Sequence, residues 1–309
     1  MNYIIGGGIT GLVTSLYFRT FVILTKGKGQ EFSYMGPKIL RKTKEVDSFI
    51  ERFINRRRRE ENRDELKSKE YTCGCSVGGK FLKLTDELKE KYLKKTRGSI
   101  WKNFRQSGMN DGKSEIEGYD MVEIYHDLLE IFDLRTRRIF LNVKKVNFKT
   151  NIISGINPVH KGVRLAFVFN KIINTLPILL FNSLIEGEFN YKLNSQIFVC
   201  IVESKEMYEK LKDYNFVYYP GEDVAYYRTT IIGENRIAIE SCRMFIPKKD
   251  LEFQCKVLKG FRLPFGKITE EIKPICEEGL AHVGRYALNS NNIRLHDLIK
   301  ELENKEVRV

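Results

Sequence analysis

The chain has 309 residues, of which 42% are hydrophobic and 30% are charged, and its formal net charge at pH 7 is +13. This length can bury a large core, which excludes a small scaffold that depends on disulfides or metals. No apolar run reaches the ~20 residues that cross a membrane, so we expect no spanning segment and no membrane partner.

The chain opens with an apolar strand that runs into a glycine-rich turn and then a helix. The predicted strand begins at Asn2, so we expect no signal peptide before it. The turn matches G-x-G-x-x-G, the pattern of dinucleotide-binding turns, in which glycines allow a tight reversal and a close approach to a pyrophosphate. The alternative is a glycine-rich turn without a ligand. We expect the cofactor phosphates to lie against Gly6, Gly8, Ile9, Thr10 and Gly11.

After a second strand at 21–24, the stretches 44–70 and 83–97 are charged, poor in proline and helical in pattern. We expect them to form a helical layer away from the nucleotide. The first contains the run Arg56 to Arg59, with Glu60 and Glu61 directly after it. Two interpretations are open: an exposed helix face with many ion pairs, or a surface that faces the phosphates of a nucleic acid or nucleotide.

Six cysteines are present, and only Cys73 and Cys75 lie close together. Without a second Cys or His pair nearby, we interpret this pair as a plain turn rather than a metal site or a redox dithiol. The absence of a regular cysteine framework favours a reducing compartment, and we expect a cytoplasmic protein.

The second half of the chain alternates short strands with few helices. A polar loop at 108–118 and an amphipathic helix at 119–132 precede strands that we expect at 139–143, 146–148, 163–169, 172–177, 196–202, 216–219, 225–232 and 236–240, and a last helix at 295–303. This order interleaves two domains, so both ends of the chain should build one cofactor site. We expect an α/β fold with a Rossmann-like domain around a central parallel sheet (1–45, 138–178 and 270–309), a helical insertion (46–137) and a smaller mixed α+β substrate domain (179–269).

Four further segments, in the right order, resemble the glutathione-reductase-type flavoproteins that include UDP-galactopyranose mutase, protoporphyrinogen oxidase and the amine oxidases. The segments are 34–46 with Gly36-Pro37-Lys38, 169–177 with Thr175, 218–228 ending in Arg228, and 279–299 with Gly284-Arg285. They cover about a third of the chain. The resemblance implies FAD and the activity of an oxidoreductase or mutase.

The resemblance also implies cofactor contacts by position. Gly36 and Pro37 would shape the backbone over the reactive face of the flavin, unless they form an ordinary turn. Gly284 and Arg285 would lie at the ring edge that becomes anionic on reduction, unless Arg285 forms a surface ion pair. The remaining implied contacts are Thr25, Lys26, Val146 and Thr175.

Four positions depart from the family. Thr25 stands where an acidic residue usually grips the adenosine ribose. Lys38 stands where the mutase has histidine, and Asn289 and Asn291 stand where it has tyrosines that touch the sugar nucleotide. These departures count against a strict UDP-galactopyranose mutase.

The catalytic candidates are Arg228, Lys38 and His282, which lies two residues before Gly284-Arg285. Arg228 would hold an anionic group of the substrate, with Tyr219 and Tyr227 supplying stacking and hydroxyl groups. Because successive residues of a strand face opposite sides, at most two of the four nearby tyrosines (218, 219, 226 and 227) can share a pocket. The alternative is that all four are core or surface aromatics.

Three functions remain open from the sequence. The first is a flavoenzyme that acts on a small or nucleotide-linked substrate. The second is a flavoenzyme that modifies a base in nucleic acid, as in phage-type DNA hypermodification, with the basic segment 94–97 and Trp101 near the polymer. The third is a FAD-binding protein without turnover. The sequence does not predict an oligomeric state.

Overall fold

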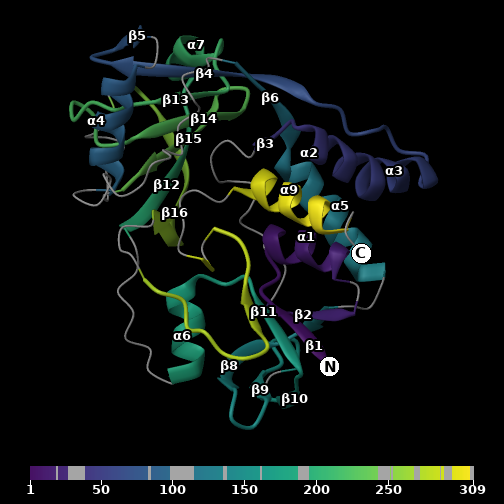
Figure 1. The fold of residues 1–309 in the computed structure, drawn as a ribbon. Coiled ribbons are helices and arrows are strands. Elements are labelled where there is room, and N and C mark those ends of the chain that lie inside the picture. Colours follow the sequence, from purple (N-terminus) through teal and green to yellow (C-terminus); the bar gives the residue numbers. More distant parts are fainter. Residues whose placement is uncertain are drawn as a thin grey trace.

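The computed structural model describes residues 1–306 except 19, 27–38, 83–84, 98–114, 135–137, 161, 187–194, 243–250, 252, 268–271, 286 and 289–293. A five-stranded parallel sheet lies in the lower part of the molecule (Figure 1), as expected for a Rossmann-like domain. Its strands, in spatial order, are β17 (Leu280–His282), β11 (Lys171–Asn174), β1 (Asn2–Ile5), β2 (Phe21–Thr25) and β7 (Arg138–Phe140). Every neighbouring pair in this sheet is parallel.

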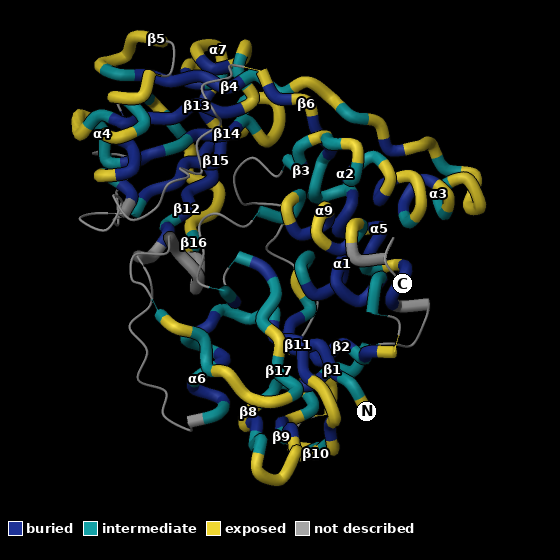
Figure 2. Tube along the Cα trace, viewed as in Figure 1, coloured by how far each residue is buried: buried dark blue, intermediate teal, exposed yellow. Residues whose placement is uncertain are grey.

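Alternate residues of β1 serve two different cores, because successive side chains of a strand point to opposite faces. Ile4 packs with the apolar faces of α1 (Ile9–Tyr17), α5 (Met121–Leu134) and α9 (Leu295–Glu306). Tyr3 and Ile5 pack on the other side of the sheet. The central strands of this sheet are the buried centre of the domain (Figure 2). That side is covered by α6 (Ile178–Glu186) and by a three-stranded antiparallel unit of β8 (Asn142–Asn147), β9 (Ile152–Ile156) and β10 (Arg164–Val168).

One helical segment at 44–60 runs beside α1 and α9, and consists of α2 (Lys44–Phe49), a π-helical turn η2 (Ile50–Asn55) and α3 (Arg56–Glu60). The hydroxyl of Thr43 caps its start by accepting the N–H of Val46 at 3.2 Å. The expectation of helix up to residue 70 is wrong beyond Glu60, since the chain then becomes irregular and enters β4 at Lys69.

A second, mixed sheet fills the upper part of the molecule (Figure 1). Its path is β16 (Lys256–Lys267), β12 (Ser195–Glu203), β15 (Arg236–Ser241), β14 (Arg228–Gly233), β13 (Phe216–Tyr218), β4 (Lys69–Val77), β6 (Glu115–Asp120) and β3 (Ile39–Arg41), with β5 (Lys80–Leu82) paired to β4. The helices α4 (Asp86–Arg97) and α7 (Lys205–Leu211) pack in separate apolar clusters of this sheet.

Several local expectations need correction. Cys73 and Cys75 lie in the long strand β4 rather than in a turn, and Gly74 between them packs against the ring of Tyr214. The segment 46–137, expected as a helical insertion, contributes β4, β5 and β6 to the mixed sheet. The helix expected from residue 119 begins at Met121, because Tyr119 belongs to β6. In the part of the chain that is described, no helix is both long and apolar enough to cross a membrane.

Candidate cofactor site

The glycine-rich turn joins β1 to α1, as the sequence predicts. Gly6 has a φ of +121°, a conformation that side chains disfavour, and its N–H donates to the carbonyl of Leu24 at 3.0 Å. Gly8 is the N-cap residue of α1, and its carbonyl accepts the N–H of Leu12 at 3.0 Å. The first turn of α1 contains no acidic residue. The positive end of the helix is therefore available to an anion.

The glycines of this turn are required for different physical reasons. A Cβ on Gly11 would clash with the carbonyl of Gly6, and a Cβ on Gly6 would clash with the hydroxyl of Thr175. A Cβ on Gly8, by contrast, would meet no described atom within 4 Å. Gly8 thus borders open space, which fits the close approach of a phosphate that the sequence predicts at this position.

Thr175 fastens the end of β11 to the end of β1. Its backbone N–H and its hydroxyl both donate to the carbonyl of Ile5 at 3.0 Å, and the hydroxyl also lies 3.2 Å from the carbonyl of Gly6. In the sheet, β1 has β2 on one side and β11 on the other, so this is the point where the strand order reverses. Open α/β sheets bind their ligands at such a point.

Thr25 and Lys26 follow the carboxyl end of β2. Thr25 is buried, and its side chain lies against Gly7, where an added Cβ would clash with the threonine hydroxyl. Its carbonyl accepts the N–H of Leu141 at 2.7 Å. Lys26 is exposed. The structure therefore places Thr25 beside the glycine turn, with Lys26 next to it on the surface.

The C-terminal segment reaches the same place from β17. The N–H of Val283 donates to the carbonyl of Asn174 at 2.9 Å, which extends the pairing of β17 with β11. Gly284 then adopts a φ of +92°, and an added Cβ would lie 2.5 Å from Cγ2 of Thr10 in the first turn of α1. Arg285 follows and is half-buried. Segments far apart in the sequence thus meet at the start of α1.

His282 uses both ring nitrogens within the protein. Nε2 lies 2.9 Å from the carbonyl of Ile275, which can only accept, so Nε2 carries the proton. Nδ1 lies 3.1 Å from Nδ2 of Asn174, whose own Oδ1 accepts the N–H of Leu176 at 2.9 Å. This orientation makes the amide nitrogen the donor to Nδ1. His282 therefore holds β17 to β11, and neither nitrogen is directed to a ligand.

The structure brings none of the other expected cofactor contacts to the glycine turn by a described side chain. Val146 lies in β8 with its side chain in the core between the two sheets of the lower domain, so only its backbone could reach a ligand. Gly36, Pro37 and Lys38 lie outside the described residues, as do Asn289, Asn291 and Trp101. Their roles stay predictions.

Arg228 lies in the upper sheet and forms an ion pair with Glu240. Its Nη2 is 2.6 Å from Oε2 of Glu240, and its Nε is 3.2 Å from Oε1. The hydroxyl of Tyr227 donates to the same carboxylate at 2.6 Å. Glu240 is 3% exposed and Arg228 is 19% exposed. Burial by itself would lower the pKa of Arg228, but the charge of Glu240 outweighs that effect and the pKa is raised.

The four tyrosines near Arg228 divide between two cores. Tyr218 and Tyr227 pack with Tyr92 of α4, at ring-centroid distances of 5.1 and 5.9 Å, whereas Tyr219 and Tyr226 pack against each other at 4.7 Å in the core beside α7. The limit of two tyrosines to a face is confirmed. Tyr219 and Tyr227, which the sequence analysis assigned to one substrate site, are not brought together.

Glu240 and Tyr92 were not among the residues predicted from the sequence. Glu240 follows the apolar run Ile237-Ala238-Ile239 in β15 at a buried position, which is a signal for a buried ion pair. Burial raises the pKa of Tyr218 to about 12 and holds the pKa of Tyr92 and Tyr227 well above the usual range. All three phenols are therefore neutral at physiological pH and act as hydrogen-bonding and packing groups.

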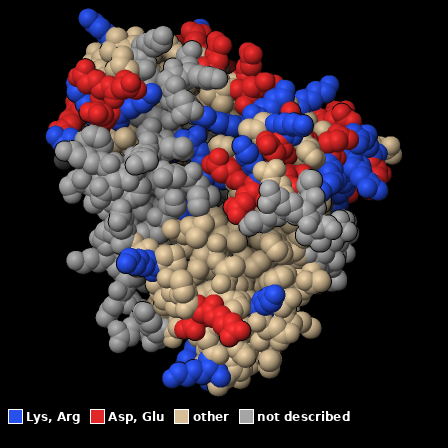
Figure 3. All heavy atoms as spheres, viewed as in Figure 1, with Lys and Arg blue, Asp and Glu red and all other residues tan. Residues whose placement is uncertain are grey.

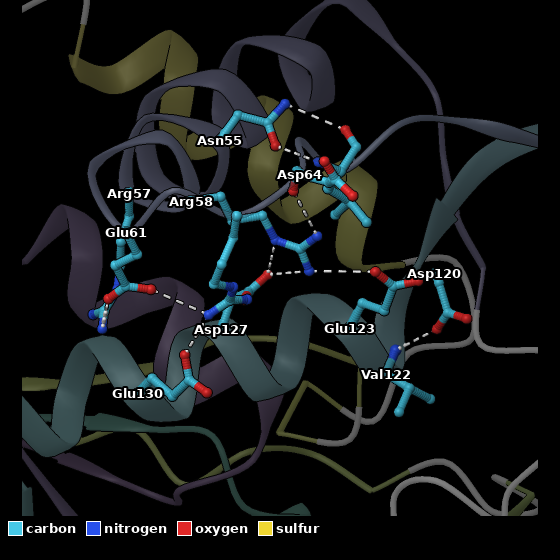
Figure 4. Close-up of polar contacts among 12 residues, drawn as sticks. Asn55, Arg57, Arg58, Glu61, Asp64, Asp120, Val122, Glu123, Asp127 and Glu130 are labelled. Carbon is cyan, nitrogen blue, oxygen red and sulfur yellow. Dashed lines mark hydrogen bonds and ion pairs between the residues drawn. The ribbon is translucent and has the colours of Figure 1, made fainter.

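The arginine run at 56–59 is largely neutralised by nearby acids (Figure 4). Nε of Arg58 donates to Asp127 of α5 at 2.8 Å, and Arg63 reaches the other oxygen of this 3%-exposed carboxylate. The other pairs are Arg56–Glu60, Arg57–Glu61, Arg58–Glu123, Arg59–Glu51, Arg59–Glu65, Arg63–Glu61 and Arg63–Glu130. Acidic and basic atoms alternate over α3 (Figure 3), which supports the first of the two interpretations, an exposed helix face with many ion pairs.

The cysteines offer no metal centre. Among the described residues, no three His, Cys, Asp or Glu side chains gather as metal ligands, and the six cysteines are free thiols. Cys75 is buried, and burial raises the pKa of its thiol to about 11. It is a packing residue of β4 rather than a reactive thiol.

Comparison with solved structures relates this fold to flavoproteins. Reduced UDP-galactopyranose mutase superimposes with a TM-score of 0.63 at 10% identity, over 100% of this chain and 94% of the other. The rebeccamycin biosynthetic enzyme RebC with reduced flavin gives 0.54 at 10% identity, and the glycerol-3-phosphate dehydrogenase of Bacillus halodurans complexed with FAD gives 0.52 at 10%.

The extent of each match differs. This chain aligns over 92% of its own length with 55% of RebC, and over 99% with 63% of the dehydrogenase. No family model and no curated protein sequence matches the chain. At this identity the structures share the fold, and the expected class, an α/β protein with a central parallel sheet and a second, mixed part, is confirmed.

Proposed function

We propose that this chain binds FAD across the glycine turn and is a flavoenzyme. The observation that carries the proposal is the seating of Gly284 on Thr10, which brings the C-terminal segment to the first turn of α1. There it joins the open side of Gly8 and the end of β11 at Thr175. The proposal is supported by neighbours whose structures contain FAD or reduced flavin.

The residues present fit such a cofactor. The free amides of Gly8, Ile9 and Thr10 and the positive end of α1 would hold the pyrophosphate. The hydroxyl of Thr25 and the ammonium of Lys26 would contact the adenosine end. The guanidinium of Arg285 would stabilise negative charge on the reduced ring. When bound, FAD supplies hydride transfer or a flavin nucleophile.

The reaction that we propose is an oxidoreductase or mutase reaction on a small or nucleotide-linked substrate. Arg228 is a candidate contact for an anionic group, within a limit set by Glu240. Because that carboxylate cancels the arginine charge, the pair as a whole attracts an anion weakly, and recognition would depend on the exposed part of the guanidinium. Of the two proposed tyrosines, Tyr227 shares the face of Arg228 and Tyr219 does not.

The first test is the absorbance spectrum of the purified full-length protein before and after dithionite, with the released cofactor identified by its mass. We expect a flavin band that bleaches on reduction and a mass that corresponds to FAD. A protein that carries no flavin and takes up none when FAD is added would refute the proposal, and would mean that the turn binds another nucleotide or none.

A second test separates an enzyme from a FAD-binding protein without turnover. The reduced protein is mixed anaerobically with UDP-galactose, and the oxidised protein with a panel of primary amines. A mutase converts the sugar while the flavin stays reduced. An amine oxidoreductase loses its oxidised-flavin absorbance in the mixture with amines and does not convert the sugar. Flavin that dithionite reduces but that neither substrate class affects would favour the non-catalytic alternative.

A further inference from the structure

The positive charge of this chain is concentrated away from the arginine run. Residues 134–185 contain nine lysines and arginines and no aspartate or glutamate, so this stretch supplies nine of the 13 net positive charges. In the fold it forms β7 to β11 and most of α6. Its three-stranded antiparallel unit, β8 to β10, lies at the bottom of the molecule in Figure 1, away from the upper mixed sheet.

The register of β8, β9 and β10 shows which residues share the outer face of this unit. Val146, Ile153 and Phe167 form one cross-strand row that packs inward on the parallel sheet. The neighbouring residues therefore face outward, since side chains alternate along a strand. They form the rows Asn147–Ile152–Val168, Lys145–Ser154–Ala166 and Asn142–Ile156–Arg164.

The cations on and beside this face have no counter-charge in the described structure. Lys144, Lys145, Lys149 and Arg164 are exposed, and no ion pair joins any of the four to another described residue. Two exposed acids, Glu277 and Glu278, precede Gly279, which packs beside Asn170 and Lys171 at the start of β11. This arrangement differs from α3, where acids alternate with the arginines.

We propose that the outer face of β8–β9–β10 docks the phosphate backbone of double-stranded nucleic acid. An acid-free surface with several unpaired cations attracts a polyanion and releases its counterions. Side-chain amides and a hydroxyl on the same face, from Asn142, Asn147 and Ser154, can add hydrogen bonds to phosphate oxygens. This inference goes beyond the proposed function, because FAD binding and turnover of a small substrate do not need such a surface.

The remaining side chains favour a duplex over other anionic partners. The aromatic rings described in this unit, Phe148 and Phe167, pack toward the core, so the face lacks the stacking platform that single strands use. It equally lacks the aromatic anchors typical of a bilayer interface. Its exposed apolar residues are aliphatic: Ile152, Ile156 and Val168 lie on the face itself, and Val159 and Val163 lie in the β9–β10 hairpin loop. A lipid surface is therefore the competing outcome that the test must address.

The test uses the full-length protein with its natural cofactor content and a fluorescent 20-base-pair DNA duplex, with affinity measured by anisotropy between 50 and 200 mM salt. The triple variant Lys144→Gln, Lys145→Gln, Lys149→Gln removes three of the proposed phosphate contacts. Each contact contributes about 0.9 to the slope of log affinity against log salt, so we expect that slope to fall by about 2.7 and the affinity to fall on the order of tenfold or more.

A matched control makes the same substitutions on lysines that already have partners. Lys91, Lys210 and Lys212 are exposed and pair with acids of their own or an adjacent turn, so their triple Gln variant has the same net charge as the test variant. We expect its affinity to stay within twofold of the parent. Melting temperatures of both variants verify that they fold.

Three results would overturn the proposal. The first is an equal loss of affinity in the test and control variants, which would mean that net charge alone drives binding. The second is no measurable duplex binding at 50 mM salt. The third is binding to vesicles with 30% phosphatidylserine but not to DNA, with loss in the test variant, which would assign the face to a lipid surface. None of these results depends on whether the protein contains flavin.

Discussion

Arg228 and Glu240 lie directly opposite each other on the antiparallel strands β14 and β15 and form a largely buried ion pair with three hydrogen bonds. Tyr227, the residue before Arg228, donates its hydroxyl to the same carboxylate. The tyrosine of α4 that packs on this group, Tyr92, connects the pair to the helix above the sheet. A residue that the sequence suggested for substrate binding is therefore also part of the packing of the upper domain.

The first prediction concerns the stability of this pair. Glu240→Gln leaves the guanidinium of Arg228 buried without a counter-charge, and removing one partner of a buried pair costs about 3–5 kcal/mol. We expect the free energy of unfolding, measured by urea denaturation, to fall by this amount.

The control for this prediction is the double variant Arg228→Met, Glu240→Leu, which removes both charges. Because apolar replacement of a whole buried pair is often close to neutral, the double variant should recover most of the loss. A Glu240→Gln protein as stable as the parent would show that the pair is solvated and that Arg228 is free to serve another ligand.

The second prediction separates the two roles of glycine in the turn. Gly11→Ala places a methyl group against the carbonyl of Gly6, so we expect it to destabilise the fold as well as cofactor binding. Gly8→Ala is different, because Gly8 has an ordinary extended conformation (φ −76°, ψ 175°) and open space beyond it. We expect this variant to melt like the parent when cofactor-free but to bind FAD at least tenfold more weakly, as titrated by flavin fluorescence. Unchanged FAD affinity in Gly8→Ala would place the pyrophosphate elsewhere.

Helices and strands that local sequence patterns determine could be predicted from the sequence. The strand, glycine turn and helix at 2–17 follow from apolar spacing and from backbone positions that only glycine fills. The strand β4 was mistaken in part for helix and turn, since its residues 69–72 are charged or polar and Cys73-Gly74-Cys75 has no alternation to mark a strand. Its conformation depends on pairing with β13 and β6, residues far away in sequence.

The candidate site was predictable where one segment carries the chemistry and not where two segments meet. Gly6, Gly8 and Gly11 lie within one short segment, and the structure has the tight turn predicted at Gly6 and the close packing predicted at Gly11. The phosphate contact at Gly8 stays a prediction. The pairing of His282 with Asn174 joins residues 108 positions apart, so the sequence alone could not show that both ring nitrogens are in use. In the same way, Asp127 neutralises the arginine run from a different helix.

The third prediction is a dependence on alkaline pH that arises from buried thiols. Burial raises the pKa of Cys75 and of Cys200 from 9.0 to about 11. Between these values the unfolded chain loses thiol protons that the folded chain keeps, so the stabilising contribution is complete below about pH 9 and decreases as the pH rises toward 11. Urea denaturation at pH 8, 10 and 11 should show this fall.

The variant Cys75→Ala, Cys200→Ala provides the control for the thiol prediction. Its free energy of unfolding should be lower at pH 8, because two packed side chains are shortened, and should fall less steeply above pH 9. The exposed Cys276 should react with a thiol reagent in the native parent at pH 8 well before Cys75 and Cys200. An equally steep alkaline fall in the variant would exclude the two buried thiols as its cause.

The last prediction asks whether the arginine run is structural. Arg58 is 11% exposed and bonds to Asp127, which is itself 3% exposed, whereas Arg56 is 74% exposed and pairs with Glu60 on the same exposed helix. Arg58→Ala leaves a buried carboxylate with only Arg63 beside it, so we expect a loss of about 3 kcal/mol in the free energy of unfolding. Arg56→Ala should change stability by at most about 0.5 kcal/mol. Both remove one positive charge, and because the proposed nucleic-acid surface lies on β8–β9–β10, both should leave duplex affinity within twofold of the parent. If either variant keeps its stability but loses DNA affinity, the surface that binds the polyanion would have to be assigned to α3 instead.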